Sequence, residues 1–173
     1  TDEEIFLQGD FDIHKLVADK KNPFIDFKGN NIIVIKDNEK YPVGKLDVLT
    51  EYGKDEKRLD LTANFLKLSL SGNFEYDKLQ GILLTEVNKY FRLPDFTPLA
   101  DSTDFYFDIN GTISYDPVFT AFLPAIKTFE TISIQSSLKS DGPTPFVGHI
   151  EVPYLLYDSL KVVRTVFDFT GNG

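Results

Sequence analysis

The chain of 173 residues contains no cysteine, no methionine and no tryptophan. Without cysteine it has no disulfide framework, no thiolate metal site and no thiol nucleophile. Without an initiator methionine, we expect residues 1–173 to be a single segment of a larger protein. No apolar run reaches the roughly eighteen residues that a membrane-spanning helix needs. We therefore expect membrane contact only through parts of the chain outside this fragment.

Positive charge is also scarce, because 18 Lys and Arg stand against 27 Asp and Glu, which gives a net charge of −9. Proteins that bind DNA or RNA gather basic residues to displace counterions from phosphates. We therefore expect no nucleic acid partner. Apolar residues nevertheless make up 42% of the chain, which is too much for a disordered polypeptide. The chain is expected to fold around a core.

The residue types that carry catalysis are few. The only histidines, His14 and His149, lie far apart in strand-like contexts, and no His-x-x-x-His pair exists to hold zinc. Calcium loops, phosphate loops and the Gly-x-Ser-x-Gly elbow of hydrolases are absent as well. We therefore expect no enzyme activity, no metal site and no cofactor.

Most of the chain alternates apolar and polar residues, as in RLDL at 58–61, KLSLS at 67–71 and FYFDI at 105–109. This alternation is typical of β-strands with one buried face. The polar connections, such as 36–40, suit hairpins and are too short for parallel crossovers. The pattern predicts about ten strands in an antiparallel sheet.

Two segments break the strand pattern and are predicted to be helical. Apolar residues fall at helical spacing near 77–91, ahead of Pro94. A shorter helix is predicted near 116–127, where Asp116 is an N-cap candidate and Pro117 suits the first helical position. These helices would be insertions in an otherwise continuous sheet.

One face of the predicted sheet is apolar throughout, and no second alternating set covers the other face. Such a sheet can fold back as a sandwich, close as a barrel, or curl into an open groove. The sandwich is the commonest of these outcomes, and composition alone does not choose among them.

A resemblance to a known family favours the groove. The run RLDLTANFLKLSLSGNFEY at 58–76, with the predicted helix that ends NKYF at 88–91, resembles the repeating segments of the TamB family. These are translocation and assembly module proteins of the AsmA-like superfamily. Downstream, FYFDI at 105–109, DPVFTAFLP at 116–124 and IEVPYLLY at 150–157 resemble the strand, short helix and returning strands of that family.

The resemblance implies a mainly β fold: an elongated, curled antiparallel sheet, or β-taco, with an open hydrophobic groove and one or two short helices. It implies a segment of an inner-membrane-anchored cell-envelope protein in the periplasm. That segment would conduct phospholipids between the inner and outer membranes and support outer-membrane protein assembly. The implied partners are phospholipid acyl chains and an outer-membrane β-barrel of the TamA type. A β-sandwich ligand-binding or adhesion module remains the alternative, and a closed barrel with one small ligand is a third possibility.

In the groove interpretation, alternate residues of the best-patterned strands line the lipid groove. These are Phe11, Ile13, Ile33, Ile35, Leu46, Val48, Leu59, Leu61, Leu68, Leu70, Phe105, Phe107, Ile109, Ile132, Ile134, Ile150, Val152, Phe167 and Phe169. In a sandwich or barrel the same residues would be core. Aspartate at Leu61, Leu70 or Ile134 is therefore expected to block lipid passage in a groove and to unfold a core.

Overall fold

The computed structural model describes residues 5–17, 19, 22–53, 56–90, 104–140 and 146–171. Along the chain its elements are β1 (Ile5–Val17), β2 (Phe24–Lys36), β3 (Glu39–Tyr52), β4 (Lys57–Ala63), β5 (Leu66–Asn73), α1 (Tyr76–Tyr90), β6 (Tyr106–Ile113), α2 (Val118–Phe122), β7 (Ile126–Phe129), β8 (Ile132–Lys139), β9 (Phe146–Tyr157) and β10 (Leu160–Gly171). Within these described residues, no helix is long and apolar enough to cross a membrane.

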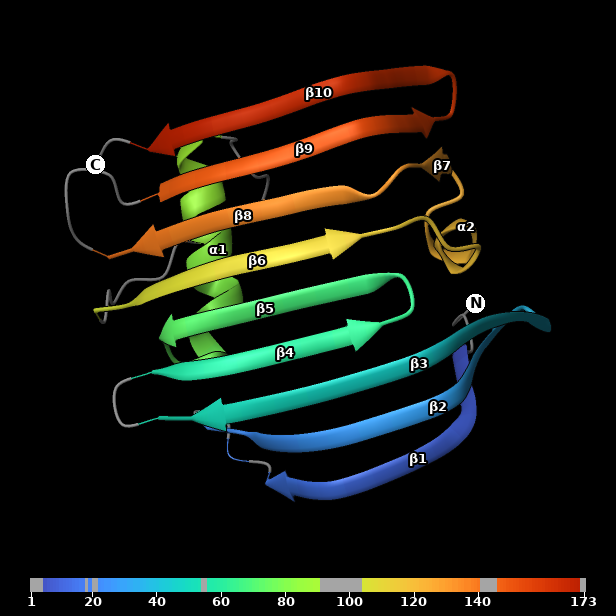
Figure 1. The fold of residues 1–173 in the computed structure, drawn as a ribbon, viewed down its shortest axis with the longest axis horizontal. Helices are drawn as coiled ribbons and strands as arrows, with labels where there is room; N and C mark the ends of the chain where they lie inside the picture. Colours follow the sequence, from blue (N-terminus) through green and yellow to red (C-terminus); the bar gives the residue numbers. More distant parts are fainter. Residues whose placement is uncertain are drawn as a thin grey trace.

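The ten strands form one antiparallel sheet that stays open (Figure 1). Its order is β1-β2-β3-β4-β5-β6-β8-β9-β10, and β7 pairs with the end of β9 that β8 leaves free. The predicted mainly β fold, a curled antiparallel sheet with short helices, is confirmed. Since there is one open sheet, the sandwich and the closed barrel that alternation left open are both wrong for the described residues.

Both helices lie on the same face of the sheet. The cluster under α1 contains Leu70, which pairs with Leu59 of β4. Leu46 packs against the cluster at α2 and pairs with Ala63, which is also a residue of β4. Residues 59 and 63 are an even number of positions apart, so they project from one face of β4. The two clusters therefore stand on that face, toward opposite ends of the strands.

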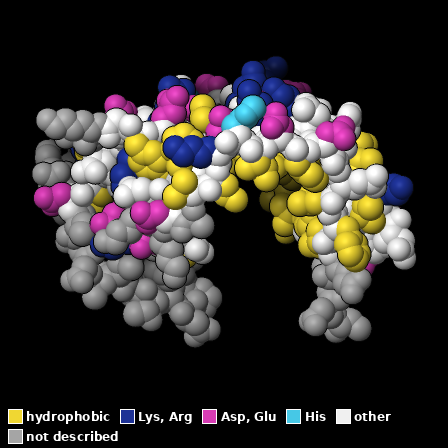
Figure 2. Space-filling model, turned by 90° about the horizontal axis from the view of Figure 1, so that it is seen from below, with side chains coloured by type: hydrophobic (Ala, Val, Ile, Leu, Met, Phe, Trp, Pro, Cys, Tyr) yellow, Lys and Arg dark blue, Asp and Glu magenta, His cyan; other side chains and the backbone are white. Residues whose placement is uncertain are grey.

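The sheet curls around the face that carries the helices. Figure 2 shows an arch whose hollow is lined by apolar side chains, whereas Lys, Arg, Asp, Glu and His side chains gather on its outer surface. We call the hollow side the groove face and the opposite side the outer face. The period-two alternation of the sequence is the cause of this separation, because successive strand residues project to opposite sides.

A bulge in β2 reverses the faces of its last residues. Asn31 has a positive φ of 53°, and the pairing of β2 with β3 shifts register beside it. A Cβ at Gly29 would meet the Ile32 side chain at 2.4 Å, so Ile32 shares the groove face with Gly29. Ile33 and Ile35, which alternate with it, consequently lie on the outer face, contrary to the prediction that they line the groove.

The helices lie close to their predicted positions. α1 spans Tyr76–Tyr90, where the spacing predicts a helix near 77–91, although residue 91 lies outside the described residues. α2 is shorter than the predicted 116–127, because the chain enters β7 at Ile126. Its start is held by Asp116, whose Oδ1 accepts a hydrogen bond of 2.9 Å from the N–H of Val118.

Candidate apolar groove

One row of apolar residues crosses the whole sheet on the groove face. Each member pairs directly with a member on the next strand. Following the strand order, this central apolar row is Ile13, Phe27, Val48, Leu61, Leu68, Gly111, Ile134, Ile150 and Phe167. With strands about 4.8 Å apart, its nine residues span about 38 Å. The row contains no polar side chain.

The rest of the described chain leaves the central apolar row partly exposed to solvent. Its interior members, from Phe27 to Ile150, are only partly buried. At the two ends, Ile13 is 55% exposed and Phe167 is 50% exposed. Residues of a packed core would be close to fully covered, so this surface is available to an apolar ligand.

Two closed clusters form the walls of the groove. Under α1, Ile82 packs with Leu70, Phe107 and Leu138, and the last two are 0% and 1% exposed. The other wall is formed at α2, where its Val118 packs against buried residues of β2 and β3. The hollow between the walls is open in Figure 2. The helices therefore brace the sides of the groove and leave its floor uncovered within the described residues.

Apart from Ile33 and Ile35, which lie on the outer face, the predicted lining residues divide into three groups. The first lies in the row itself: Ile13, Val48, Leu61, Leu68, Ile134, Ile150 and Phe167. The second flanks it on the same face: Phe11, Leu46, Leu59, Ile109, Ile132, Val152 and Phe169. In the third group, Leu70 and Phe107 are core residues under α1, and Phe105 packs against the same cluster.

Two members of the row were not predicted. Phe27 lies in an alternating strand, and its partners Ile13 and Val48 were both predicted, so the strand register identifies it. Gly111 carries no side chain, and a Cβ there would lie 3.1 Å from the side chain of Leu68. The alternation of β6 places residue 111 on the groove face. The lining was predicted from apolar side chains, however, and glycine has none, so Gly111 was not included.

The outer face carries a matching polar row. The residues directly opposite one another there are Asp26, Leu49, Asp60, Ser69, Asn110, Gln135, His149 and Asp168. Only Leu49 in this series is apolar. A shallow depression of about 450 Å³ lies over part of the row, between Ser71 and Thr170, and its lining is mostly small polar side chains. One face of the sheet therefore suits water and the other suits an apolar ligand.

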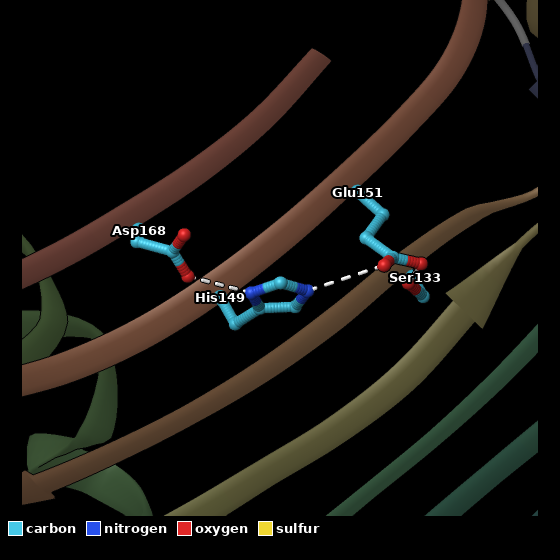
Figure 3. A network of polar contacts seen from close by, with 4 residues as sticks. All are labelled: Ser133, His149, Glu151 and Asp168. Carbon is cyan, nitrogen blue, oxygen red and sulfur yellow. Dashed lines mark hydrogen bonds and ion pairs between the residues drawn. The ribbon is translucent and has the colours of Figure 1, made fainter. Parts of the chain in front are cut away.

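His149 joins β9 to β10 on the outer face (Figure 3). Its Nδ1 lies 2.6 Å from Oδ1 of Asp168, and its Nε2 lies 3.4 Å from Oε1 of Glu151. The hydrogen bond to Asp168 is the main reason that the pKa of His149 is raised, followed by the bond to Glu151. The hydroxyl of Ser133 pairs with Glu151 at 3.3 Å and not with His149, so the group lacks the nucleophile–base contact of a hydrolase.

Residues suited to metal binding do not gather anywhere on the described chain. No group of three or more His, Asp or Glu side chains in that part of the protein is placed to hold a metal ion. His14 contacts Asp12, with Nε2 3.3 Å from Oδ2, on the exposed edge strand β1. The apolar groove is therefore the most extensive candidate site.

The fold and the groove together define a class of protein: an open, single-sheet β protein with one apolar and one polar face. No family model, curated protein or solved structure matches this chain.

Proposed function

We propose that this chain is a segment of a lipid conduit, in which the groove face binds phospholipid acyl chains and lets them move along the central apolar row. The observation that carries the proposal is the row itself, from Ile13 to Phe167, which is continuous across the sheet and only partly covered. A pocket for one small ligand would instead enclose that ligand and bury about 70–90% of its surface.

The chemistry of the row suits a mobile ligand. An acyl chain gains roughly 0.8 kcal/mol for each methylene that leaves water, whichever aliphatic or aromatic side chain covers it. The row is about 38 Å long, while one leaflet of a bilayer core is about 15 Å thick. A lipid can therefore shift along the row without leaving apolar contact, while its headgroup remains in solvent at the open side.

The wider setting of the proposal comes from the sequence resemblance. On that resemblance we propose that the segment lies in the periplasm, as part of an inner-membrane-anchored cell-envelope protein that carries phospholipids between the inner and outer membranes. We propose on the same basis that it supports outer-membrane protein assembly with a β-barrel partner of the TamA type. The open groove supports the lipid part of this proposal, because transfer between membranes needs a continuous apolar path.

Photo-crosslinking on neighbouring residues tests the proposal. A photoreactive amino acid is placed at Leu68 or Ile134 in the central apolar row, and in matched controls at Ser69 or Gln135. Because adjacent strand residues face opposite sides, each control differs from its test position mainly in the face it occupies. After incubation with phospholipid vesicles, mass spectrometry should find lipid adducts at the first two positions only. Equal labelling on both faces, or no adduct on the groove face of a folded protein, would refute lipid binding in the groove.

A further inference from the structure

Within the described residues, the edge strand β10 is long and open on one side, although Arg164 in its middle has a positive φ of 50°. It pairs with β9 from Leu160 to Gly171 without a register shift, and no described strand pairs with its other side. It contains no proline, and its Val163, Val166 and Phe167 are 49%, 51% and 50% exposed. Proteins usually shorten, bend or charge such edges, because an open edge is a template for another strand.

The β10 sequence has two complementary pairs of residues at equal distances from Val166, namely Arg164 with Asp168 and Val163 with Phe169. We propose that β10 pairs with β10 of a second copy of this chain, antiparallel, around a two-fold axis through Val166. In an antiparallel pair, residues equally distant from the centre lie opposite each other. The resulting cross-strand pairs are Val166 with Val166, Thr165 with Phe167, Arg164 with Asp168, Val163 with Phe169, and Val162 with Thr170.

The charges in this register are complementary. Asp168 lies on the outer face opposite His149, and in this register it would lie directly across from Arg164 of the second copy, so the pair occurs twice. The side chain of Asp168 is 76% exposed even though its Oδ1 contacts His149, which leaves it accessible to the guanidinium. Opposite charges directly across a strand pair are stabilising, and like charges are destabilising.

Two aromatic residues in this register, Phe167 and Phe169, fall on the groove face, whereas Val166 on the axis lies on the outer face. Phe167 ends the central apolar row, and Phe169 lies beside it. A two-fold axis perpendicular to the sheet keeps the same face on the same side in both copies. The central apolar rows of the two copies would therefore meet at β10, and the exposed ring of Phe167 would gain apolar neighbours.

The other edge strand, β1, suits a second copy less well. Its pairing with β2 shifts register at Gly9 and at His14, which interrupts a regular edge. β1 and β10 also run in the same direction in the sheet (Figure 1). Pairing β1 with β10 of another copy in one continuous sheet would give a parallel pair, whereas every pair in this sheet is antiparallel.

Sedimentation velocity of the 173-residue chain tests the pairing. We expect a concentration-dependent dimer with twice the 19.7 kDa mass of one chain. Val166→Lys places two like charges on the two-fold axis and should abolish the dimer. Val147→Lys is the matched control, since Val147 is another exposed valine of the outer face but lies on β9, and it should leave the dimer intact. A monomer at all concentrations, or a dimer that persists in Val166→Lys, would overturn the proposal.

Single cysteines test the register, since the natural chain has none. Directly opposite residues lie about 4.5–5.5 Å apart between Cα atoms, which is within the disulfide range of about 4.4–6.8 Å. Val166→Cys should therefore form a disulfide-linked dimer under mild oxidation. Lys161→Cys should not, because the two sulfurs would be about 34 Å apart on this register. If both variants formed disulfide-linked dimers equally well, the two chains would be colliding without a fixed register, and the proposed pairing would be wrong.

Charge reversal gives a separate check on the same register. Arg164→Asp should weaken the dimer, because aspartates 164 and 168 would then face each other across the axis. Adding Asp168→Arg restores opposite charges and should restore the dimer. Failure of the double variant to recover, with its fold intact by circular dichroism, would exclude this register.

Discussion

Apolar residues of the groove face differ in how much of their side chain is exposed to solvent. Substitution by aspartate is therefore expected to have different effects at different positions. Leu61 and Ile134 are partly exposed in the central apolar row, whereas Leu70 is 4% exposed under α1. Leu61→Asp and Ile134→Asp should lower stability by only about 1 kcal/mol and should abolish binding of a fluorescent acyl chain. Leu70→Asp should unfold the chain, because an unpaired carboxylate has no solvent there.

Circular dichroism and lipid binding, measured on the same samples, separate these outcomes. Gln135→Asp is the control for Ile134→Asp, because residue 135 lies on the outer face beside it. The control should keep both its fold and its lipid binding. If Ile134→Asp unfolds the chain as Leu70→Asp does, residue 134 is covered in solution and the groove is not open.

The cross-strand link made by His149 predicts a pH-dependent stability. Its contacts are Asp168 of β10, Glu151 of its own strand, and Gln135, which lies opposite on β8. Since the pKa of His149 is raised above the ordinary 6.5, mainly by the hydrogen bond to Asp168, protonated His149 stabilises the fold. This contribution is fully present below pH 6.5 and is lost as the pH rises through the raised value.

Thermal melting across pH measures this contribution. His149→Gln should lower the Tm relative to the natural chain at acidic pH, and the difference should shrink toward alkaline pH. A difference that stays constant with pH would mean that the imidazole acts through packing alone and not through its charge.

At the scale of elements, α1 is the main brace of the sheet. Phe107 is fully buried in the cluster that α1 covers, and its ring centre lies 5.9 Å from that of Phe74. Phe107→Ala should therefore destabilise the chain by about 3–5 kcal/mol, as large core truncations do. Phe167→Ala is the matched control on the groove face, where the side chain is 50% exposed, and it should cost less than half as much.

Chemical denaturation of the two variants measures both free energies of unfolding. If Phe107→Ala and Phe167→Ala lowered the free energy of unfolding by similar amounts, both rings would lie in equally buried sites. That result would contradict the role of α1 as the main brace of the sheet. A loss confined to Phe107→Ala would support the division between a packed wall under α1 and an open floor.

The elements themselves were largely predictable from the sequence. Alternation in segments such as 58–61 and 67–71 is a local property, and helical spacing near 77–91 is another. The same local patterns place Leu61, Leu68 and most other predicted lining residues on one face.

Other features could not be predicted because they depend on cross-strand contacts. The bulge at Asn31 sends Ile33 and Ile35 to the outer face, although the run IIVI gives no sign of it. Which apolar residues become core also depends on where α1 packs. The local pattern does not contain this information, so it assigns Leu70 and Phe107 to the groove lining, although α1 covers them. Periodicity assigns residues to a face, but it does not say what covers that face.

At the scale of the whole molecule, the curl of the sheet separates an apolar hollow from a charged outer surface (Figure 2). Binding of acyl chains in the hollow depends on apolar contact and should be almost insensitive to salt. Approach to a membrane is different, because a chain with a net charge of −9 is repelled by anionic lipid headgroups.

Uptake of lipid from vesicles should therefore depend on vesicle charge and on ionic strength together. At low salt, uptake of a fluorescent phospholipid should be slower from vesicles that contain anionic lipid than from zwitterionic vesicles. The difference should fade as salt is added, because the screening length decreases from about 30 Å at 0.01 M to about 3 Å at 1 M. Stopped-flow fluorescence measures both rates, and zwitterionic vesicles across the same salt series are the control. Faster uptake from anionic vesicles at low salt would contradict the argument, since it would mean that a local basic surface, and not the net charge of −9, governs the encounter.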